Sequence, residues 1–380
     1  MLQGVARHYG RERMKAFERR LGRLQALMRD ENVDLVVIGP GANMLYLTGF
    51  SDDAGERPLL FIVLREGPPK FLVPELYARQ VEEAAAFPPT HVWADTQGPE
   101  GALRGALRGV EARRVAVDDA LAARAVLMLQ AVLPGASFSL ASPLLRELRM
   151  RKGPEELVPM ERAAVIVDRS FSKLLENASF RGRTEREVAR DLEAIVLEEG
   201  AEGMAFETLV ASGPNSAHPH HRAGDRRIEP GDVVILDFGC RVGGYCSDIT
   251  RTVVCGRPTP LMREVQGTLL EAQEEGVRAA RPGIPAQEVD RAVRGVIARA
   301  GFGERFIHRT GHGIGLEVHE DPYIVEGNPL ALEEGMTFSV EPGIYLPGEF
   351  GIRVEDIVVV VEADGARRLN GCPRELLQVD

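Results

Sequence analysis

The sequence lacks the features that would tie the chain to a membrane or to nucleic acid. No run approaches the roughly 18 apolar residues that a membrane span needs. No apolar run of signal-peptide length follows the Arg-rich start, so a secretory leader is not expected. The formal net charge of −11 argues against nucleic acid and anionic membranes as main partners. We therefore expect a cytoplasmic protein without nucleic-acid or membrane partners.

Cysteine is also scarce, with four residues in a chain of 380. No two of them form a CxxC pair, and three fall in segments that are expected to be strands: Cys240, Cys246 and Cys255, with Cys372 as the fourth. A reduced chain is the simple interpretation of this pattern. Zinc–thiolate binding is a minor alternative.

The length and the apolar fraction of 44% allow about two globular domains. In the first part of the chain, short apolar runs alternate with helical patterns, which indicates a small α/β domain with a mixed sheet. Strands are expected at 35–38, 59–64, 70–73 and 114–117. The polar stretch 149–154 ends in Gly-Pro, and we place the boundary there. The predicted domains are residues 1–152 and 153–380.

The second part is expected to be α+β, with helices covering an antiparallel sheet. Thr184 and Glu187 have the spacing of a capping box, which opens one of the helices. Helices are predicted at 155–177, 184–199, 260–281 and 285–300, and β-rich segments at 232–255, 336–345 and 352–362.

Carboxylates within these late strands are the anomaly of the sequence. Asp237 ends the apolar run 233–238, and Asp248 lies on the next strand, after a turn near 241–244. Glu341 and Glu355 form a similar pair near the end of the chain. A buried carboxylate is costly unless a partner compensates its charge, and several of them together would repel one another. Either some are protonated or cations hold them together.

The histidines favour cations. Six of the eight lie between His218 and His319. His312 has a glycine on each side, which allows close backbone approach and unusual dihedral angles. One imidazole with four carboxylates is a mainly hard ligand set that suits Mn²⁺, Co²⁺ or Zn²⁺. Bridging carboxylates would give the paired ions of a two-metal hydrolase.

Several motifs in this order resemble one family, the proline peptidases (Xaa-Pro dipeptidase, or prolidase, and aminopeptidase P). In the second part these are the 308–320 stretch, the Asp237/Asp248 hairpin, Glu341-Pro342-Gly343, Arg353-Val354-Glu355-Asp356, and Ala211-Ser212-Gly213-Pro214-Asn215 followed by Pro219-His220. In the first part, residues 43–49 and 73–77 are similar to the family's creatinase-type domain. The resemblance covers nearly the whole chain.

The resemblance implies a pita-bread catalytic domain, built of helices over a curved antiparallel sheet, behind an N-terminal creatinase-type α/β domain. It implies metal-assisted hydrolysis of the Xaa–Pro bond, at the N-terminus of peptides or in dipeptides. The expected cofactors are two divalent ions per subunit, Mn²⁺ first and Co²⁺ or Zn²⁺ as alternatives, and the expected assembly is a homodimer. The implied metal ligands are Asp237, Asp248, His312, Glu341 and Glu355.

The resemblance also assigns roles around the metals. Glu341 would transfer the proton of the attacking water, His319 would assist at the carbonyl oxygen, and His220 would position the residue after the cleaved bond. The remaining residues are expected to bind substrate or to support the ligands: Tyr245, Arg353, Tyr345, Tyr323 and His308.

One departure from the family pattern concerns substrate length. Archaeal-type prolidases carry an Arg shortly after the His-Glu element, and Tyr323 occupies that position here. Its loss weakens the strict dipeptidase interpretation and leaves room for longer peptides. Arg57 is a hypothetical replacement for that missing Arg. Three other functions stay open: a hydrolase of a non-peptide amide on the same scaffold, a methionine aminopeptidase, and a non-catalytic binding protein.

Overall fold

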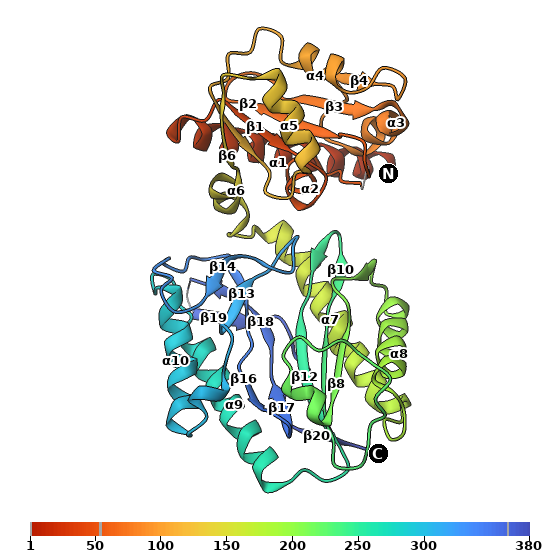
Figure 1. Ribbon diagram of the computed structural model, residues 1–380, viewed down its shortest axis with the longest axis vertical. Coiled ribbons are helices and arrows are strands. Elements are labelled where there is room, and N and C mark those ends of the chain that lie inside the picture. Colours follow the sequence, from red (N-terminus) through yellow and green to blue (C-terminus); the bar gives the residue numbers. More distant parts are fainter. Residues whose placement is uncertain (1, 53–54, 363–364) are drawn as a thin grey trace. The chain divides into compact units, whose positions relative to one another are not determined.

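The computed structural model describes residues 2–52, 55–362 and 365–380, with side chains from Met14 onward. The chain divides into two compact units, Met1–Leu148 and Arg149–Asp380 (Figure 1).

The first unit is built on a six-stranded mixed sheet in the order β4-β3-β2-β1-β5-β6. Strand β1 has the sequence Leu-Val-Val-Ile and is buried along its whole length, as its continuous apolar run predicts. It pairs antiparallel with β2 and parallel with β5. The strands are β1 Leu35–Ile38, β2 Leu60–Leu64, β3 Lys70–Pro74, β4 His91–Trp93, β5 Arg114–Val117 and β6 Ser137–Leu140, and the helices are α1 Leu2–Asp30, α2 Ala42–Thr48, α3 Glu75–Ala84, α4 Glu100–Ala106, α5 Ala123–Val132 and α6 Ser142–Arg149.

In its described residues, the second unit has four α-helices and a set of mostly antiparallel strands. The helices are α7 Pro154–Asn177, α8 Glu185–Glu198, α9 Pro260–Ala279 and α10 Ala286–Arg299, with the short 3-10 helices η1 Gly213–Ala217 and η2 Gly303–Arg305. The strands are β7 Gly203–Met204, β8 Leu209–Ser212, β9 Val233–Phe238, β10 Cys240–Val242, β11 Tyr245–Cys246, β12 Ile249–Cys255, β13 Gly311–Gly313, β14 Glu320–Ile324, β15 Thr337–Val340, β16 Gly343–Leu346, β17 Phe350–Arg353, β18 Asp356–Val361, β19 Gly365–Arg368 and β20 Leu377–Val379.

Two helix pairs enclose these strands (Figure 1). Helices α7 and α8 pack on the β20-β12-β9-β8 sheet through a core that includes Phe171, Leu192 and Leu236. Helices α9 and α10 pack on the β14-β13-β15-β18-β19 sheet through a second core that includes Leu269 and Phe338. A bridge between Thr250 and Glu355 joins the two sheets between their cores. The candidate site lies at this junction.

Local signals explain where the helices begin. The hydroxyl of Thr184 accepts a hydrogen bond from the backbone N–H of Glu187 at 3.2 Å, and the Glu187 carboxylate accepts from the Thr184 N–H at 2.8 Å. This is the predicted capping box. Helix α9 begins with Pro260, whose missing N–H is harmless in the first turn. Among the described residues, no helix is both long and apolar enough to cross a bilayer.

Each of the last two β-rich segments is interrupted once. The segment 336–345 contains two strands, β15 and β16, separated by Glu341 and Pro342. Proline has no N–H to give to a neighbouring strand, so the ladder ends there. The segment 352–362 is also interrupted, at Val354 and Glu355 between β17 and β18, although no proline is present there.

Candidate metal centre

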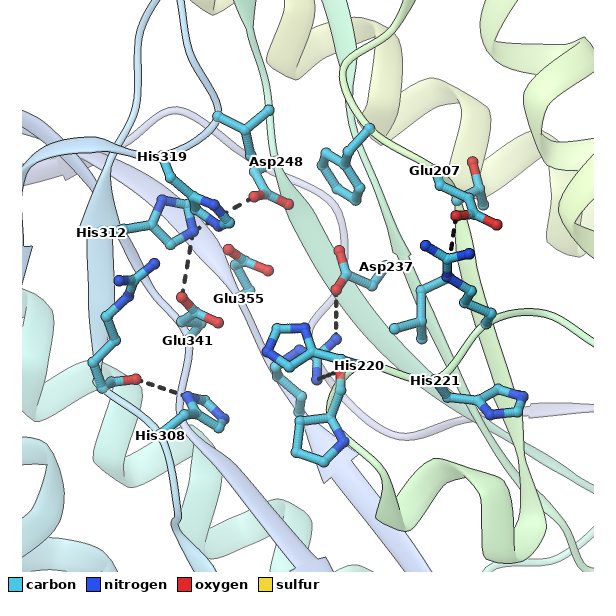
Figure 2. A pocket seen from close by; sticks show the side chains of 18 residues that line it. Glu207, His220, His221, Asp237, Asp248, His308, His312, His319, Glu341 and Glu355 are labelled. Carbon is cyan, nitrogen blue, oxygen red and sulfur yellow. Dashed lines mark hydrogen bonds and ion pairs between the residues drawn. The ribbon is translucent and has the colours of Figure 1, made fainter. Parts of the chain in front are cut away.

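The five expected metal ligands come from the strands of the second unit. Asp237 is next to last in β9, and Asp248 directly precedes β12. Glu341 follows β15, and Glu355 stands between β17 and β18. His312 is the middle residue of β13. Figure 2 shows these five side chains turned toward a common space from both sheets.

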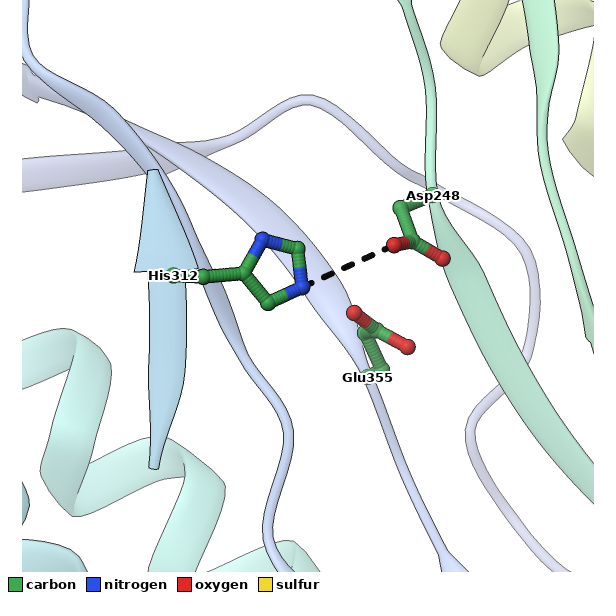
Figure 3. A group of neighbouring side chains, drawn as sticks. All are labelled: Asp248, His312 and Glu355. Atoms are coloured by element: carbon green, nitrogen blue, oxygen red, sulfur yellow. Dashed lines mark ion pairs between the residues drawn. The ribbon is translucent and has the colours of Figure 1, made fainter. Parts of the chain in front are cut away.

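Four of the five side chains lie within a few ångströms of at least one other. The Nε2 atom of His312 lies 3.4 Å from Oε1 of Glu341 and 3.7 Å from Oδ2 of Asp248. Candidate ligand atoms of Asp248, His312 and Glu355 all lie within 4.8 Å of one another (Figure 3). All three residues are buried.

His312 is neutral at physiological pH. Burial, followed by the charge of His319, lowers the pKa of His312 to about 3. Its Nδ1 lies 3.1 Å from the carbonyl oxygen of Gly313, which assigns the proton to Nδ1. The Nε2 lone pair therefore faces the carboxylate oxygens. Its contacts with Asp248 and Glu341 are not ion pairs, because an uncharged imidazole cannot form one.

The carboxyl groups are strongly perturbed. Burial, followed by the charges of neighbouring carboxylates, raises the pKa of Asp248 and of Glu355 well above the usual range. Burial raises the pKa of Glu341 to about 7, against the opposing charge of Arg353. Without a cation, these carboxyl groups therefore favour the protonated, neutral form more than they would in water.

Unsatisfied oxygens show what this arrangement lacks. Oδ1 of Asp237, Oδ1 of Asp248 and Oε1 of Glu355 are buried and have no hydrogen-bond partner. Buried polar atoms are seldom left in this state, because the desolvation of each costs about 1–3 kcal/mol. Oxygen atoms without donors around a neutral imidazole lone pair fit divalent cations with hard ligand preferences.

A hydrogen-bonded layer behind the carboxylates fixes their orientation. The Arg353 guanidinium bonds to Oδ2 of Asp237, and its Nε donates to Oγ1 of Thr250 at 3.0 Å. The Thr250 hydroxyl donates to Oε2 of Glu355 at 2.7 Å. Each of these two carboxylates thus has one oxygen held by the protein and one left for a cation. Such partners set the direction of metal ligands.

His308 and Tyr345 extend this layer. His308 Nδ1 lies 2.7 Å from the carbonyl oxygen of Arg309, so Nε2 accepts from the Tyr345 hydroxyl at 3.0 Å. Arg353 donates to the same hydroxyl at 2.9 Å. Burial, followed by the charge of Arg353, lowers the pKa of His308 to about 3, which is consistent with a neutral acceptor.

Close strand packing places His312. A Cβ atom on Gly311 would lie 1.8 Å from the carbonyl oxygen of Ser339, and one on Gly313 would lie 2.3 Å from backbone atoms of Asp321. Neither glycine has a positive φ, so the expected unusual dihedral angles are absent and the close approach alone requires glycine. The Ser339 hydroxyl accepts from the His312 N–H at 3.0 Å and donates to Oε1 of Glu341 at 3.1 Å.

The five candidate ligands line a cavity of about 700 Å³. The His319 ring stands perpendicular to the His312 ring, with centroids 4.2 Å apart. Burial, followed by the charge of Arg309, lowers the pKa of His319. His220 lies in the segment after η1 and lines the same cavity (Figure 2). The polar residues that line the cavity are Glu207, Thr208, His220, His221, Arg222, Asp237, Asp248, His308, Arg309, His312, His319, Glu341, Arg353 and Glu355.

Three residues singled out from the sequence lie elsewhere. The Tyr245 hydroxyl donates to Oε1 of Glu156 at 2.7 Å and does not line the cavity. Tyr323 is not among the lining residues either, but the guanidinium of Arg309 stacks on its ring at 4.6 Å. Arg57 lies in the first unit, where it bonds to both carboxylate oxygens of Asp95.

Sequence reasoning overlooked Glu185, the first residue of α8 and fully buried. Its Oε1 accepts from the Ser212 N–H at 2.8 Å and from the Asn215 amide at 3.0 Å. Its Oε2 bonds to His221 Nε2 at 2.7 Å and to the Gly224 N–H at 3.0 Å. Glu185 therefore fixes the segment that carries His220. The sequence does offer one cue to Glu185, namely its position directly after Thr184, the capping residue of α8.

With this geometry established, the comparison with known proteins gives the class. Residues 159–362 match the model of metallopeptidase family M24, and residues 20–151 match the creatinase/prolidase N-terminal domain. The chain therefore belongs to family M24, a family of metal-dependent hydrolases. The resemblance inferred from the sequence motifs is confirmed.

Individual relatives cover nearly the whole chain. A probable dipeptidase PepE of Mycobacterium tuberculosis (H37Rv) is 40% identical over 369 residues, which is 96% of this chain and 97% of that protein. An Xaa-Pro dipeptidase of Lactobacillus helveticus is 36% identical over 361 residues, 94% of this chain and 98% of that protein. The crystal structure of a prolidase from Thermococcus sibiricus has a TM-score of 0.90 at 39% identity and covers 96% of this chain and 99% of its own. The predicted fold class is thereby confirmed.

Proposed function

We propose that this protein hydrolyses the peptide bond that precedes proline, with two divalent cations held by Asp237, Asp248, His312, Glu341 and Glu355. The observation that carries the proposal is the set of buried carboxylate oxygens without donors around the neutral His312. The names of the relatives, Xaa-Pro dipeptidase and prolidase, support the choice of substrate.

The donor set supports two ions rather than one. Four carboxylates bring a charge of −4 when ionised, and the Arg353 guanidinium bound to Asp237 offsets one of these charges. Two divalent ions would bring +4 against the remaining −3, and loss of one proton from a bound water would balance the difference, whereas one ion would leave an uncompensated negative charge in a buried site. Oxygen-rich coordination favours Mn²⁺, with Co²⁺ or Zn²⁺ as alternatives.

The mechanism assigns distinct tasks to the residues around the cations. The bound ions would supply Lewis acidity and a water that is acidic near neutral pH. Glu341, held by the Ser339 hydroxyl, would accept the proton of the attacking water and deliver it to the departing proline nitrogen. His319 would donate a hydrogen bond to the carbonyl oxygen as negative charge develops there. His220, positioned through Glu185, would contact the proline.

Metal analysis followed by hydrolysis assays tests this function. The purified protein is treated with a chelator, reloaded with Mn²⁺, and assayed on Ala-Pro, Ala-Pro-Ala and a Met-Ala-type peptide. We expect about two ions per chain and cleavage restricted to the bond before proline. Asp248→Asn should reduce the bound metal and lower kcat by about 10²-fold or more, because a ligand is lost.

Specific outcomes would contradict the proposal. Tight metal binding without cleavage of either proline peptide would refute it and favour a non-peptide amide hydrolase or a binding protein. Cleavage after methionine, with no activity before proline, would identify a methionine aminopeptidase. We further propose a cytoplasmic homodimer, which size-exclusion chromatography with light scattering can test for the assembly.

A further inference from the structure

Arg309 is a cation of the cavity, and no described residue forms an ion pair with it. Three arginines line the cavity: Arg222, Arg309 and Arg353. Arg353 is bonded to Asp237, and Arg222 lies 3.6 Å from a carboxylate oxygen of Glu207. Among the residues that the structure describes, the Arg309 guanidinium has neither a hydrogen-bond partner nor an ion pair. A half-buried guanidinium with five unused donors is suited to an anionic ligand.

The side chain of Arg309 is held in place without using those donors. Its guanidinium carbon lies 4.6 Å from the centroid of the Tyr323 ring, a cation–π contact with β14. Its carbonyl oxygen accepts from Nδ1 of His308 at 2.7 Å, which anchors the backbone just before β13. Stacking fixes the plane of a guanidinium and leaves its N–H edge free. Arg309 is thus oriented before a ligand binds.

We propose that Arg309 binds the free α-carboxylate of a dipeptide substrate and thereby selects dipeptides over longer peptides. The inference rests on the proposed Xaa–Pro hydrolysis. In a dipeptide the carboxylate belongs to the proline itself, so it must lie beside the scissile bond and inside the cavity that the candidate metal ligands line. In a longer peptide the same position is an uncharged amide. An unpaired guanidinium in this cavity therefore discriminates between the two substrate classes.

Arg57 is the competing cation. Its Nε and Nη2 atoms bond to the two carboxylate oxygens of Asp95 at 2.9 and 2.8 Å, and its Nη1 bonds to Glu56 at 2.9 Å. Binding a substrate carboxylate would require it to give up these partners. Arg309 has no such bonds to break, and its residue lines the cavity.

The test compares a dipeptide with its amide. Hydrolysis of Ala-Pro and of Ala-Pro amide, which lacks the carboxylate charge, is measured with Mn²⁺ for the unmodified protein and for Arg309→Ala. Loss of a hydrogen-bonded charge pair corresponds to about a 10- to 100-fold change. We expect KM for Ala-Pro to rise by about that factor, while kcat/KM for the amide changes by less than about threefold. Arg305→Ala removes the same charge from the exposed η2 segment and should change neither value.

A binding measurement separates this inference from the proposed function. L-proline and L-prolinamide are titrated into the protein by calorimetry, without any turnover. The unmodified protein should prefer L-proline, and Arg309→Ala should lose that preference. If the unmodified protein cleaves neither substrate, the proposed function is wrong, and the titration alone decides the role of Arg309.

Variants of the stacking partner keep the test decisive if Arg309→Ala fails to fold. Tyr323→Phe preserves the ring and should leave the dipeptide KM within about twofold, whereas Tyr323→Leu removes the stack and should raise it. An equal loss on dipeptide and amide would overturn the proposal, because Arg309 would then act on every substrate alike. A selective dipeptide defect in Arg57→Ala but not in Arg309→Ala would overturn it as well.

Discussion

Three carboxyl groups next to His312 are held closer to neutrality than they would be in water. Burial is the main cause for Asp248, Glu341 and Glu355, and the repulsion among these groups and Asp237 adds to it. In each case the pKa in the folded protein lies above the unfolded value. The folded protein therefore binds more protons than the unfolded chain at intermediate pH.

The metal-free protein is thus predicted to lose stability as pH rises. For Glu341 the stabilising contribution is complete below about pH 4.5 and is lost as pH increases through about 7. The melting temperature in the presence of a chelator should fall between about pH 5 and pH 8, as scanning calorimetry can measure. Mn²⁺ should reverse the decline, because the cations stabilise the ionised carboxylates.

Glu341→Gln is the control for this pH dependence. It removes one raised pKa and should flatten the metal-free profile toward neutral pH. A melting temperature that stays constant or rises over the same range without metal would show that the carboxylates are not held toward neutrality.

At the scale of single residues, the sequence indicated which residues belong to the site better than it indicated their contacts. The candidate ligands were recognisable because carboxylates rarely occur in buried strands, and all five side chains line one cavity. The hydroxyl of Tyr245, in contrast, bonds to Glu156, a residue 89 positions earlier. Contacts between residues so distant in sequence depend on how helices dock, which no local pattern encodes.

At the scale of the elements, the last two β-rich segments of the second unit are interrupted at two of the candidate ligands, Glu341 and Glu355. Strands β15 and β17 end just before these two residues, which frees the residues from regular pairing and lets their side chains turn into the cavity. The sequence predicted the β-rich segments and a strand end at Glu341, but not the break at Val354 and Glu355. Of the two, only the first has a local signal, namely Pro342.

The approach of β13 to its neighbours yields a prediction. Gly311→Ala would place a methyl group 1.8 Å from the Ser339 carbonyl oxygen, a backbone atom that cannot yield without moving β15. We expect a loss of at least about 2–3 kcal/mol in the free energy of unfolding and a reduced Mn²⁺ content. Urea unfolding and metal analysis would measure the two effects.

Gly267→Ala is the matched substitution. It lies in α9, is exposed, and has no atom within 4 Å of its added Cβ. It should stabilise the protein by about 0.5–1 kcal/mol, because alanine favours a helix interior over glycine. If both variants had the same stability, strand crowding at Gly311 would not be the controlling effect.

At the scale of the whole molecule, the candidate centre belongs to one unit. All five expected ligands lie within Arg149–Asp380, and both hydrophobic cores around them consist of residues from that unit. The division between the units falls at Leu148, close to the polar Gly-Pro segment that marks it in the sequence.

A fragment of residues 149–380 is therefore predicted to fold and to bind Mn²⁺. It retains the buried cluster in which Glu320 bonds to Arg149 and Lys152, so the fragment should begin no later than Arg149. Cooperative thermal unfolding and an increase in melting temperature with Mn²⁺ would support this. A fragment starting at 153 serves as the comparison and should be less stable, because Glu320 would be buried without its cations.

The four cysteines have a practical consequence. All are buried, and burial raises the pKa of Cys240 and Cys246 to about 11 and that of Cys372 to about 12. Thiols in this state react slowly with maleimides at neutral pH, because the thiolate is the reactive form. A pair of introduced cysteines at exposed sites, such as Leu127→Cys and Leu197→Cys, would thus accept fluorescent dyes selectively. Energy transfer between the dyes would then report the separation of the two units during turnover, with every native cysteine left in place.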